Sequence, residues 1–292
     1  MPAPAASPNL EQQATQRLRE FYTRAPEEEL TQPEWQVVHE AEHCTYLNRR
    51  CVKIRKSDPT VTIGSCTVQY GGEGVIICPH RFLQKRQIFL DTVHLLGRHE
   101  PGNQLHVVPE VSIPSGNVDY FVISAKHGKV QDYLAIEIQA VDTTGKVWPA
   151  RQRFVHEYID PDVTVPLGHY GMNWFMTAKT IMIQLHHKAE TLELLHKKLV
   201  VVVQDNLYRY MNQKLDTSVV REANAADTVQ FHVYTLHSAP QAPLLLELAA
   251  RYSTTPEGIA VMLGAKKSAF IAEADLLARL EPRLGDRTLL TI

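Results

Sequence analysis

Residues 116–145, GNVDYFVISAKHGKVQDYLAIEIQAVDTTG, contain two runs rich in β-branched and aromatic residues with a short polar stretch between them. We predict strands at 118–124 and 133–141, joined as an antiparallel hairpin through 126–131. Because side chains alternate along a strand, one face of the second strand carries Leu134, Ile136, Ile138 and Ala140, and the other carries Ala135, Glu137, Gln139 and Val141. A carboxylate in so apolar a strand is unfavourable unless it is paired or binds a cation.

Asp119, at the start of the first strand, can supply a second carboxylate beside Glu137 if the hairpin forms. Two carboxylates on adjacent strands can chelate a hard cation such as magnesium. Gln139 shares the face of Glu137, and Glu110, nine residues before Asp119, can add an outer ligand. The alternative is structural: Asp119 is a turn residue, Glu137 faces solvent at a sheet edge, and Glu110 is a surface charge.

The rest of the chain alternates between strand and helix patterns. Strands are predicted at 199–204 and 228–236, and a long helix at 174–197 has its apolar residues on one face. This alternation predicts an α/β fold with its core at 85–240. Apolar residues from Leu10 to Phe21 recur at helical spacing, so we expect an amphipathic helix there.

The segment from residue 242 is predicted to be helical, with a helix start at Thr255-Pro256 and a stop at Gly264. LELAARYSTTPEGIAVMLG (246–264) fits either a DNA-binding helix-turn-helix or a plain α-hairpin. The predicted organisation is an N-terminal arm and helix (1–35), a four-cysteine module (36–84), the core (85–240) and a helical C-terminal region (241–292).

All four cysteines of the chain, Cys44, Cys51, Cys66 and Cys78, fall within 35 consecutive residues. Such clustering favours a tetrahedral four-thiolate metal site over unrelated buried thiols or disulfides. The spacing is not the paired C-x-x-C pattern of common zinc ribbons, so it indicates a metal without identifying it. The turn Gly71-Gly72-Glu73-Gly74 and Pro79 suit a backbone that folds around a small ion.

The composition is that of a globular protein, with 44% hydrophobic and 21% charged residues. Thirty basic and 32 acidic side chains give a net charge of −2, so any basic surface must be local. The start, MPAPAASPNLEQQ, lacks the features of a signal peptide, and no apolar run is long enough to span a membrane. We therefore expect a cytoplasmic protein without a membrane partner.

Basic residues gather around the cysteines, and they are either a DNA-binding surface or an ordinary solvated face. These basic residues are Arg49, Arg50, Lys53, Arg55, Lys56, Arg81, Lys85 and Arg86. His186, His187 and Lys188 are weaker candidates, for packing or for a phosphate contact.

These blocks, taken in order, resemble the NotI family of Type II restriction endonucleases. The resemblance covers roughly residues 40–210 and rests on the cysteine cluster and five sequence blocks. The blocks are ICPHR (77–81), NVDY (117–120), EIQAVDTTG (137–145), GMNWFMTAKTIMIQLHHKAE (171–190) and KKLVVVVQD (197–205). Their order and combination are far more specific than any one block.

The resemblance implies a nuclease core of the PD-(D/E)XK kind, a mixed sheet flanked by helices, with the four-cysteine module inserted. Asp119 and Glu137 would bind catalytic magnesium, and Gln139 would occupy the place where most such nucleases have lysine. The four cysteines would hold structural iron, although four thiolates also suit zinc. A homodimer on double-stranded DNA, cutting both strands at a GC-rich palindrome, is implied as well. The eight basic residues named above are then the candidates for DNA contact, because arginine reads guanine bidentately in the major groove.

Two other functions fit the same residues. The first is a defence or repair nuclease of the same fold with loose sequence specificity, because the catalytic pattern does not encode the recognition sequence. The second is a non-catalytic, metal-containing DNA-binding protein in which Asp119 and Glu137 are only structural.

Overall fold

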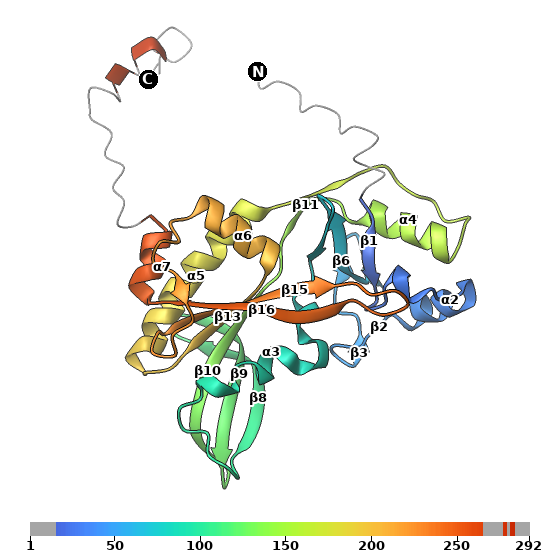
Figure 1. The fold of residues 1–292 in the computed structure, drawn as a ribbon. Coiled ribbons are helices and arrows are strands. Elements are labelled where there is room, and N and C mark those ends of the chain that lie inside the picture. Colours follow the sequence, from blue (N-terminus) through green and yellow to red (C-terminus); the bar gives the residue numbers. More distant parts are fainter. Residues whose placement is uncertain (1–15, 265–276, 279–280, 284–292) are drawn as a thin grey trace.

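The centre of the structure is a seven-stranded mixed sheet (Figure 1). This computed structural model describes residues 16–264, 277–278 and 281–283. Across the sheet the order is β14 (Arg221–Glu222), β16 (Leu245–Thr254), β15 (Val229–His237), β13 (Leu199–Gln204), β10 (Lys129–Gln139), β9 (Gly116–Lys126) and β8 (Gln104–Ile113). Strands β10, β13 and β15 are parallel, and the others pair antiparallel. The predicted α/β class is therefore confirmed, with a mixed sheet.

The predicted hairpin forms between β9 and β10, with Ala135 opposite Phe121. The predicted alternation in β10 is also confirmed, because Leu134 and Ile136 pack in one core while Ala135 packs in the other. Beside β10 lies β13, in which all six residues are buried, as expected of a central parallel strand covered on both faces.

Helices cover both faces of the sheet. One face is covered by α5 (Trp174–Leu194), α6 (Asp205–Lys214) and α7 (Pro256–Met262), whose apolar residues join one core with β13. The other face is covered by α3 (Gln87–Leu90) and by the 3-10 segments Pro79–Arg86 and Val93–Leu95. The long helix predicted at 174–197 is confirmed as α5 and ends three residues earlier.

A smaller sheet, β1 (Leu18–Phe21), β6 (Ser65–Tyr70) and β7 (Glu73–Ile76), lies at one end of the large sheet (Figure 1). The helices α2 (Gln32–Ala41) and α4 (Trp148–Tyr158) lie beside it, and they touch through Trp35 and Phe154. Three two-stranded ribbons are β2 (His43–Cys44) with β3 (Arg49–Arg50), β4 (Ile54–Arg55) with β5 (Asp58–Thr62), and β11 (Thr143–Gly145) with β12 (Tyr170–Met172). Short 3-10 turns are at Pro26–Glu28 and Glu281–Arg283.

The predicted N-terminal helix is wrong where the structure describes it. Leu18–Phe21 forms strand β1, which pairs antiparallel with β6. Leu18, Glu20 and Phe21 are buried there, because the strand fills the side of the small sheet against α4. Residues 10–15 of the predicted helix lie outside the described residues.

Both alternatives predicted for residues 246–264, a helix-turn-helix and a plain α-hairpin, are also wrong. The first half of this segment is strand β16, which pairs antiparallel with β15 along nearly its whole length. Pairing with a preformed strand outweighs the helix propensity of the leucines and alanines. The second half is helix α7, where the Thr255 side chain accepts a hydrogen bond from the Gly258 N–H at 3.2 Å. The predicted start at Thr255-Pro256 and stop at Gly264 are confirmed.

Candidate active site

Asp119 and Glu137 lie across from each other on β9 and β10. The pairing of β9 with β10 ends at Tyr120 and Ile136, and Asp119 and Glu137 are the next residues along the two strands. The charge of Asp119 acts on Glu137, so the two carboxylates are close. Asp119 Oδ2 accepts a hydrogen bond from the Ile138 N–H at 2.8 Å, in place of a backbone acceptor. Directly opposed residues point to the same face of a sheet, and for Glu137 that face is covered by α5. The sheet therefore sets two carboxylates side by side under a helix.

The pKa values of both carboxyl groups are raised. Burial raises the pKa of Glu137, and the charge of Asp119 raises it further, to about 7, against the opposing effect of Lys188. Burial also raises the pKa of Asp119, while the Ile138 N–H and Lys188 lower it. A bound divalent cation would relieve this repulsion, because it favours the ionised form of both groups.

Glu110 is the third carboxylate in this row. Pro109 pairs with Tyr120 and Val111 with Val118, so Glu110 lies across from Asp119 on β8. Its φ is +53°, a left-handed conformation that is uncommon for a residue with a β-carbon. Such strained backbone clusters at functional sites. The charge of Glu110 also raises the pKa of Asp119, so the two groups are close enough to interact.

Lys188, on α5, is the cation nearest to the pair. Its Nζ donates to Glu137 Oε1 at 2.7 Å, and both side chains are buried. The sequence predicts packing or a phosphate contact for Lys188 and does not predict its pairing with Glu137. The available signal was a lysine within the apolar face formed by Leu185, Ala189 and Leu192.

Gln139 follows two residues after Glu137 and is partly exposed. Its Nε2 donates to the carbonyl oxygen of Ala140 at 2.6 Å. The amide is thus turned to its own backbone, and it brings no charge to the site.

The raised pKa of Glu137 predicts a pH dependence of stability in metal-free protein. Its folded value of about 7 lies above the ordinary 4.5, so the protonated carboxyl favours folding. This contribution is complete below about pH 4.5 and is lost as pH rises through about 7. We expect the melting temperature to fall by several degrees across this range, and Glu137→Gln to remove that part of the slope. Thermal unfolding in chelator measures both proteins, with Glu247→Gln as control, and equal slopes in all three contradict the assignment.

The four cysteines come together. All of them line one small pocket of about 10 Å³, which Lys53 and His80 also line. The four are free thiols, so no disulfide connects them. Burial raises the pKa of Cys66 above all, and the charge of Cys78 raises it further. The predicted clustering in sequence is therefore also a clustering in space.

The proximity of the four thiols does not by itself show a metal site. In the part of the chain that the structure describes, no three His, Cys, Asp or Glu side chains are arranged as ready metal ligands. That result holds for the cysteine pocket and for the carboxylates alike. The shared pocket shows that the four thiols are neighbours, and a bound metal stays a prediction at both places.

The prediction of a DNA contact for Arg81 is wrong. Its side chain is fully buried, and its Nε donates to Glu20 Oε2 at 2.7 Å. A second guanidinium nitrogen donates to the Leu244 carbonyl oxygen at 2.7 Å. Arg81 thus links the small sheet to the chain before β16, and its side chain is not accessible to DNA.

The other basic candidates differ in how free they are. Lys53 Nζ donates to the Ile77 carbonyl oxygen at 3.0 Å beside the cysteines, and Arg50 Nε donates to Glu42 Oε2 at 2.6 Å. The guanidinium of Arg55 lies 4.2 Å from the ring centre of Trp148. Arg49 and Lys56 are exposed. The structure therefore leaves Arg49 and Lys56 as the most available charges of this group.

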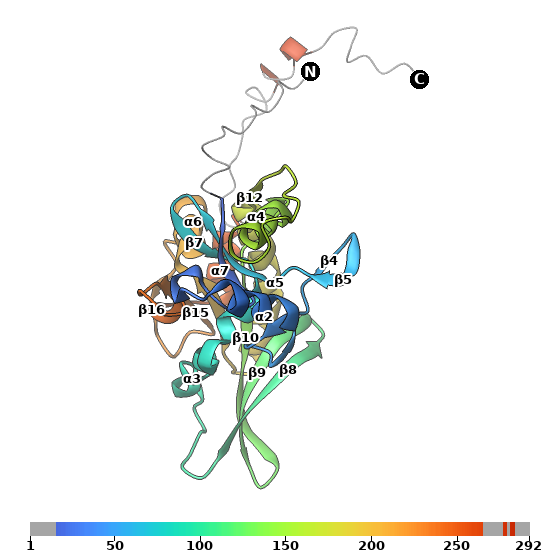
Figure 2. The ribbon, with the colours of Figure 1, turned by 90° about the vertical axis from the view of Figure 1, so that its right-hand side faces the viewer.

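Lys85 and Arg86 are exposed but lie elsewhere. They immediately precede α3, and Figure 2 shows α3 on the opposite side of the molecule from the β4–β5 ribbon. The eight predicted DNA-contacting residues are therefore not one continuous surface. On α5, His186 Nε2 and His187 Nδ1 lie 3.6 Å and 3.9 Å from the carboxylate of Glu190.

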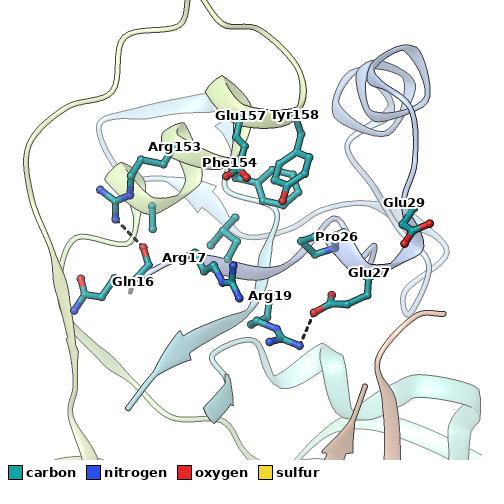
Figure 3. A pocket seen from close by; sticks show the side chains of 12 residues that line it. Gln16, Arg17, Arg19, Pro26, Glu27, Glu29, Arg153, Phe154, Glu157 and Tyr158 are labelled. Carbon is teal, nitrogen blue, oxygen red and sulfur yellow. Dashed lines mark hydrogen bonds and ion pairs between the residues drawn. The ribbon is translucent and has the colours of Figure 1, made fainter. Parts of the chain in front are cut away.

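The cavity drawn in Figure 3, of about 380 Å³, lies between β1 and α4. Its charged lining includes Arg17, Arg153 and the ion pair of Arg19 with Glu27. None of the four predicted catalytic residues lines it. Among the described helices, none has the length and apolarity needed to cross a membrane.

The protein has an α/β fold with a mixed sheet that carries two neighbouring carboxylates. Its class is that of a restriction endonuclease, a hydrolase that acts on DNA. The chain is a member of the NotI restriction endonuclease family: the family model described as "Restriction endonuclease NotI" matches residues 11–246. Searches of curated proteins and of solved structures gave no match. The family predicted from the sequence blocks is thereby confirmed, over more of the chain than those blocks covered.

Proposed function

We propose that this chain is a Type II restriction endonuclease with a PD-(D/E)XK core, which makes double-strand cuts at a GC-rich palindrome by magnesium-dependent hydrolysis. The observation that carries the proposal is the placement of Asp119 opposite Glu137 on β9 and β10. Membership of the NotI family supports the same reading.

The donor set at these strands fits magnesium. Carboxylate oxygens are the ligands it prefers. Burial, together with neighbouring negative charge, raises the pKa values of Asp119 and Glu137, and a bound cation would offset this cost. Asp119 and Glu137 would hold the ion, with Glu110 as an outer ligand, and the bound ion would activate water and offset charge on the phosphate. Asp119 is already oriented by the Ile138 N–H. The Gln139 side chain starts on the same face as Glu137, and its amide would have to leave the Ala140 carbonyl oxygen to orient water or a phosphate oxygen.

We propose that Cys44, Cys51, Cys66 and Cys78 hold a structural metal, iron or zinc. The support is that all four line one small pocket without a disulfide. Four thiolates are a suitable donor set for either metal. Cys44 lies on the short β2–β3 ribbon, where it is the only buried residue, so a metal would add stability where packing is thin.

Arg49 and Lys56, which are exposed, are proposed to contact DNA. Weaker candidates are those that already have contacts within the protein, Arg50, Lys53 and Arg55, and those on a separate surface, Lys85 and Arg86. The charges of Arg49 and Asp119 both act on the pKa of His80, which supports a position of Arg49 near the carboxylates. A palindromic site has two-fold symmetry, and we propose that a homodimer matches it.

We expect Lys56→Gln to weaken DNA binding about equally across sequences. If Lys56 neutralises one phosphate, the logarithmic salt slope should become shallower by about one. Lys214→Gln, an exposed lysine at the end of α6, is the matched control and should leave the slope unchanged. Binding titrations at several salt concentrations measure both. Equal slopes for Lys56→Gln and the parent would show that the β4–β5 ribbon is an ordinary solvated surface and does not contact DNA.

Plasmid digestion with magnesium tests the proposed function. Discrete fragments with defined ends support a site-specific endonuclease. A smear indicates a loosely specific nuclease, and intact plasmid with a mobility shift indicates a DNA-binding protein without catalysis.

A further inference from the structure

Lys188 occupies a position in α5 that packing alone would give to an apolar residue. It is 5% exposed and shares a helix face with Leu185 and Ala189, which are buried against the sheet. Burying an ammonium group is unfavourable unless it is paired. Its partner is Glu137, at 2.7 Å, 51 residues away in the sequence.

The charge of Lys188 acts on both members of the carboxylate pair. It lowers the pKa of Glu137 by a hydrogen bond and by its charge, and it lowers that of Asp119 by charge. The ammonium group therefore lies within reach of the whole pair, on the side that α5 covers.

Gln139 leaves the site without a positive charge from β10. Its amide donates to its neighbour's carbonyl oxygen instead of pointing at Glu137. A lysine at this place would have stabilised the negative charge that develops on phosphate. The strand provides no such group, whereas the helix above it does.

We propose that Lys188 is the catalytic cation of this nuclease, donating to a non-bridging oxygen of the scissile phosphate, so that α5 supplies the charge that Gln139 lacks. The inference rests on the proposed function. During hydrolysis the water oxygen forms a bond to phosphorus and gives a proton to solvent. The opposite ester bond breaks, and its oxygen takes up a proton. Lys188 takes no part in these proton transfers and offsets the charge on phosphate.

The alternative is that Lys188 only holds Glu137 in place, and cation binding separates the two roles. If Lys188 acts on phosphate, Lys188→Met should lower single-turnover cleavage about 100-fold. Calcium affinity measured by calorimetry should stay equal or tighten, because a charge that competes for Glu137 is gone. A purely positioning role predicts that calcium affinity falls together with cleavage, and that result would overturn the proposal.

A second experiment moves the positive charge from position 188 to position 139. Lys188→Met/Gln139→Lys returns an ammonium group to the same face and should cut at least about tenfold faster than Lys188→Met. In the parent background, Gln139→Lys should reduce cleavage without abolishing it, because two ammonium groups then crowd one carboxylate pair. No gain from the relocated lysine would overturn the proposal.

Lys179→Met is the matched control. It is exposed on α5, nine residues before Lys188 and so on the opposite side of the helix, and it should cut like the parent. If Lys188→Met does not fold, Lys188→Gln keeps a donor for Glu137 without the charge and should show the same loss. Asp119→Asn, measured in the same assay, separates the claim about Lys188 from the claim that Asp119 and Glu137 form the active site. If it is inactive while Lys188→Met cuts at the parental rate, only the role of Lys188 fails, whereas active Asp119→Asn refutes the site itself.

Discussion

Replacing Asp119 by Asn or Glu137 by Gln is expected to reduce magnesium-dependent cleavage by about 1000-fold or more while DNA binding persists. Both changes preserve side-chain size, but each removes a negative charge from the proposed cation site. Water activation and charge stabilisation on phosphate are then lost together, and they are jointly worth several kcal/mol of barrier. Gel assays of plasmid cleavage and of duplex mobility measure the two properties separately.

The matched control is Glu247→Gln, which removes an exposed carboxylate from β16 in the same sheet. It should cut at the parental rate. If Asp119→Asn binds DNA and still cuts like this control, Asp119 is only an element of the hairpin.

Cys66→Ser is expected to remove the structural metal and to destabilise the segment that carries the cysteines. Metal binding is coupled to folding, so the loss of one thiolate should lower both metal content and melting temperature. Elemental analysis of protein purified without chelator should give about one metal per parent chain and much less in the variant.

Cys51→Ser distinguishes a metal site from packing. Cys66 is buried, whereas Cys51 is only partly buried. Packing alone predicts a clearly smaller effect at Cys51, but a four-thiolate site predicts comparable loss of metal in both variants. Parent protein that is folded and active without metal would contradict the proposed site.

The parts of the fold that could be predicted have local sequence signals. The alternation around Glu137 and the apolar face of α5 were read correctly, because each is a periodic pattern within one element. The helix prediction for residues 246–254 is wrong because leucine and alanine favour a helix locally. These residues form a strand because they pair with β15, and a local pattern does not show that tertiary contact. Leu18–Phe21 failed for the same reason, since its partner is β6.

The candidate site divides in the same way. Asp119 could be placed near Glu137 because both belong to one hairpin. The contacts of Lys188 and Arg81 could not be predicted, because Glu137 and Glu20 lie 51 and 61 residues away from them, and no local pattern records such pairs. The sequence showed a lysine and an arginine, and tertiary structure turned both away from solvent.

Single-turnover cleavage of one labelled duplex by the parent and by Glu137→Gln tests the account most directly. Enzyme in excess over DNA removes differences in binding and product release, so the rate reports the chemical step. We predict that the parent cuts only when magnesium is added and that Glu137→Gln is slower by about 1000-fold at equal DNA occupancy. Cleavage by Glu137→Gln at the parental rate would contradict the account, and the buried pair of Glu137 and Lys188 would then be part of the architecture alone.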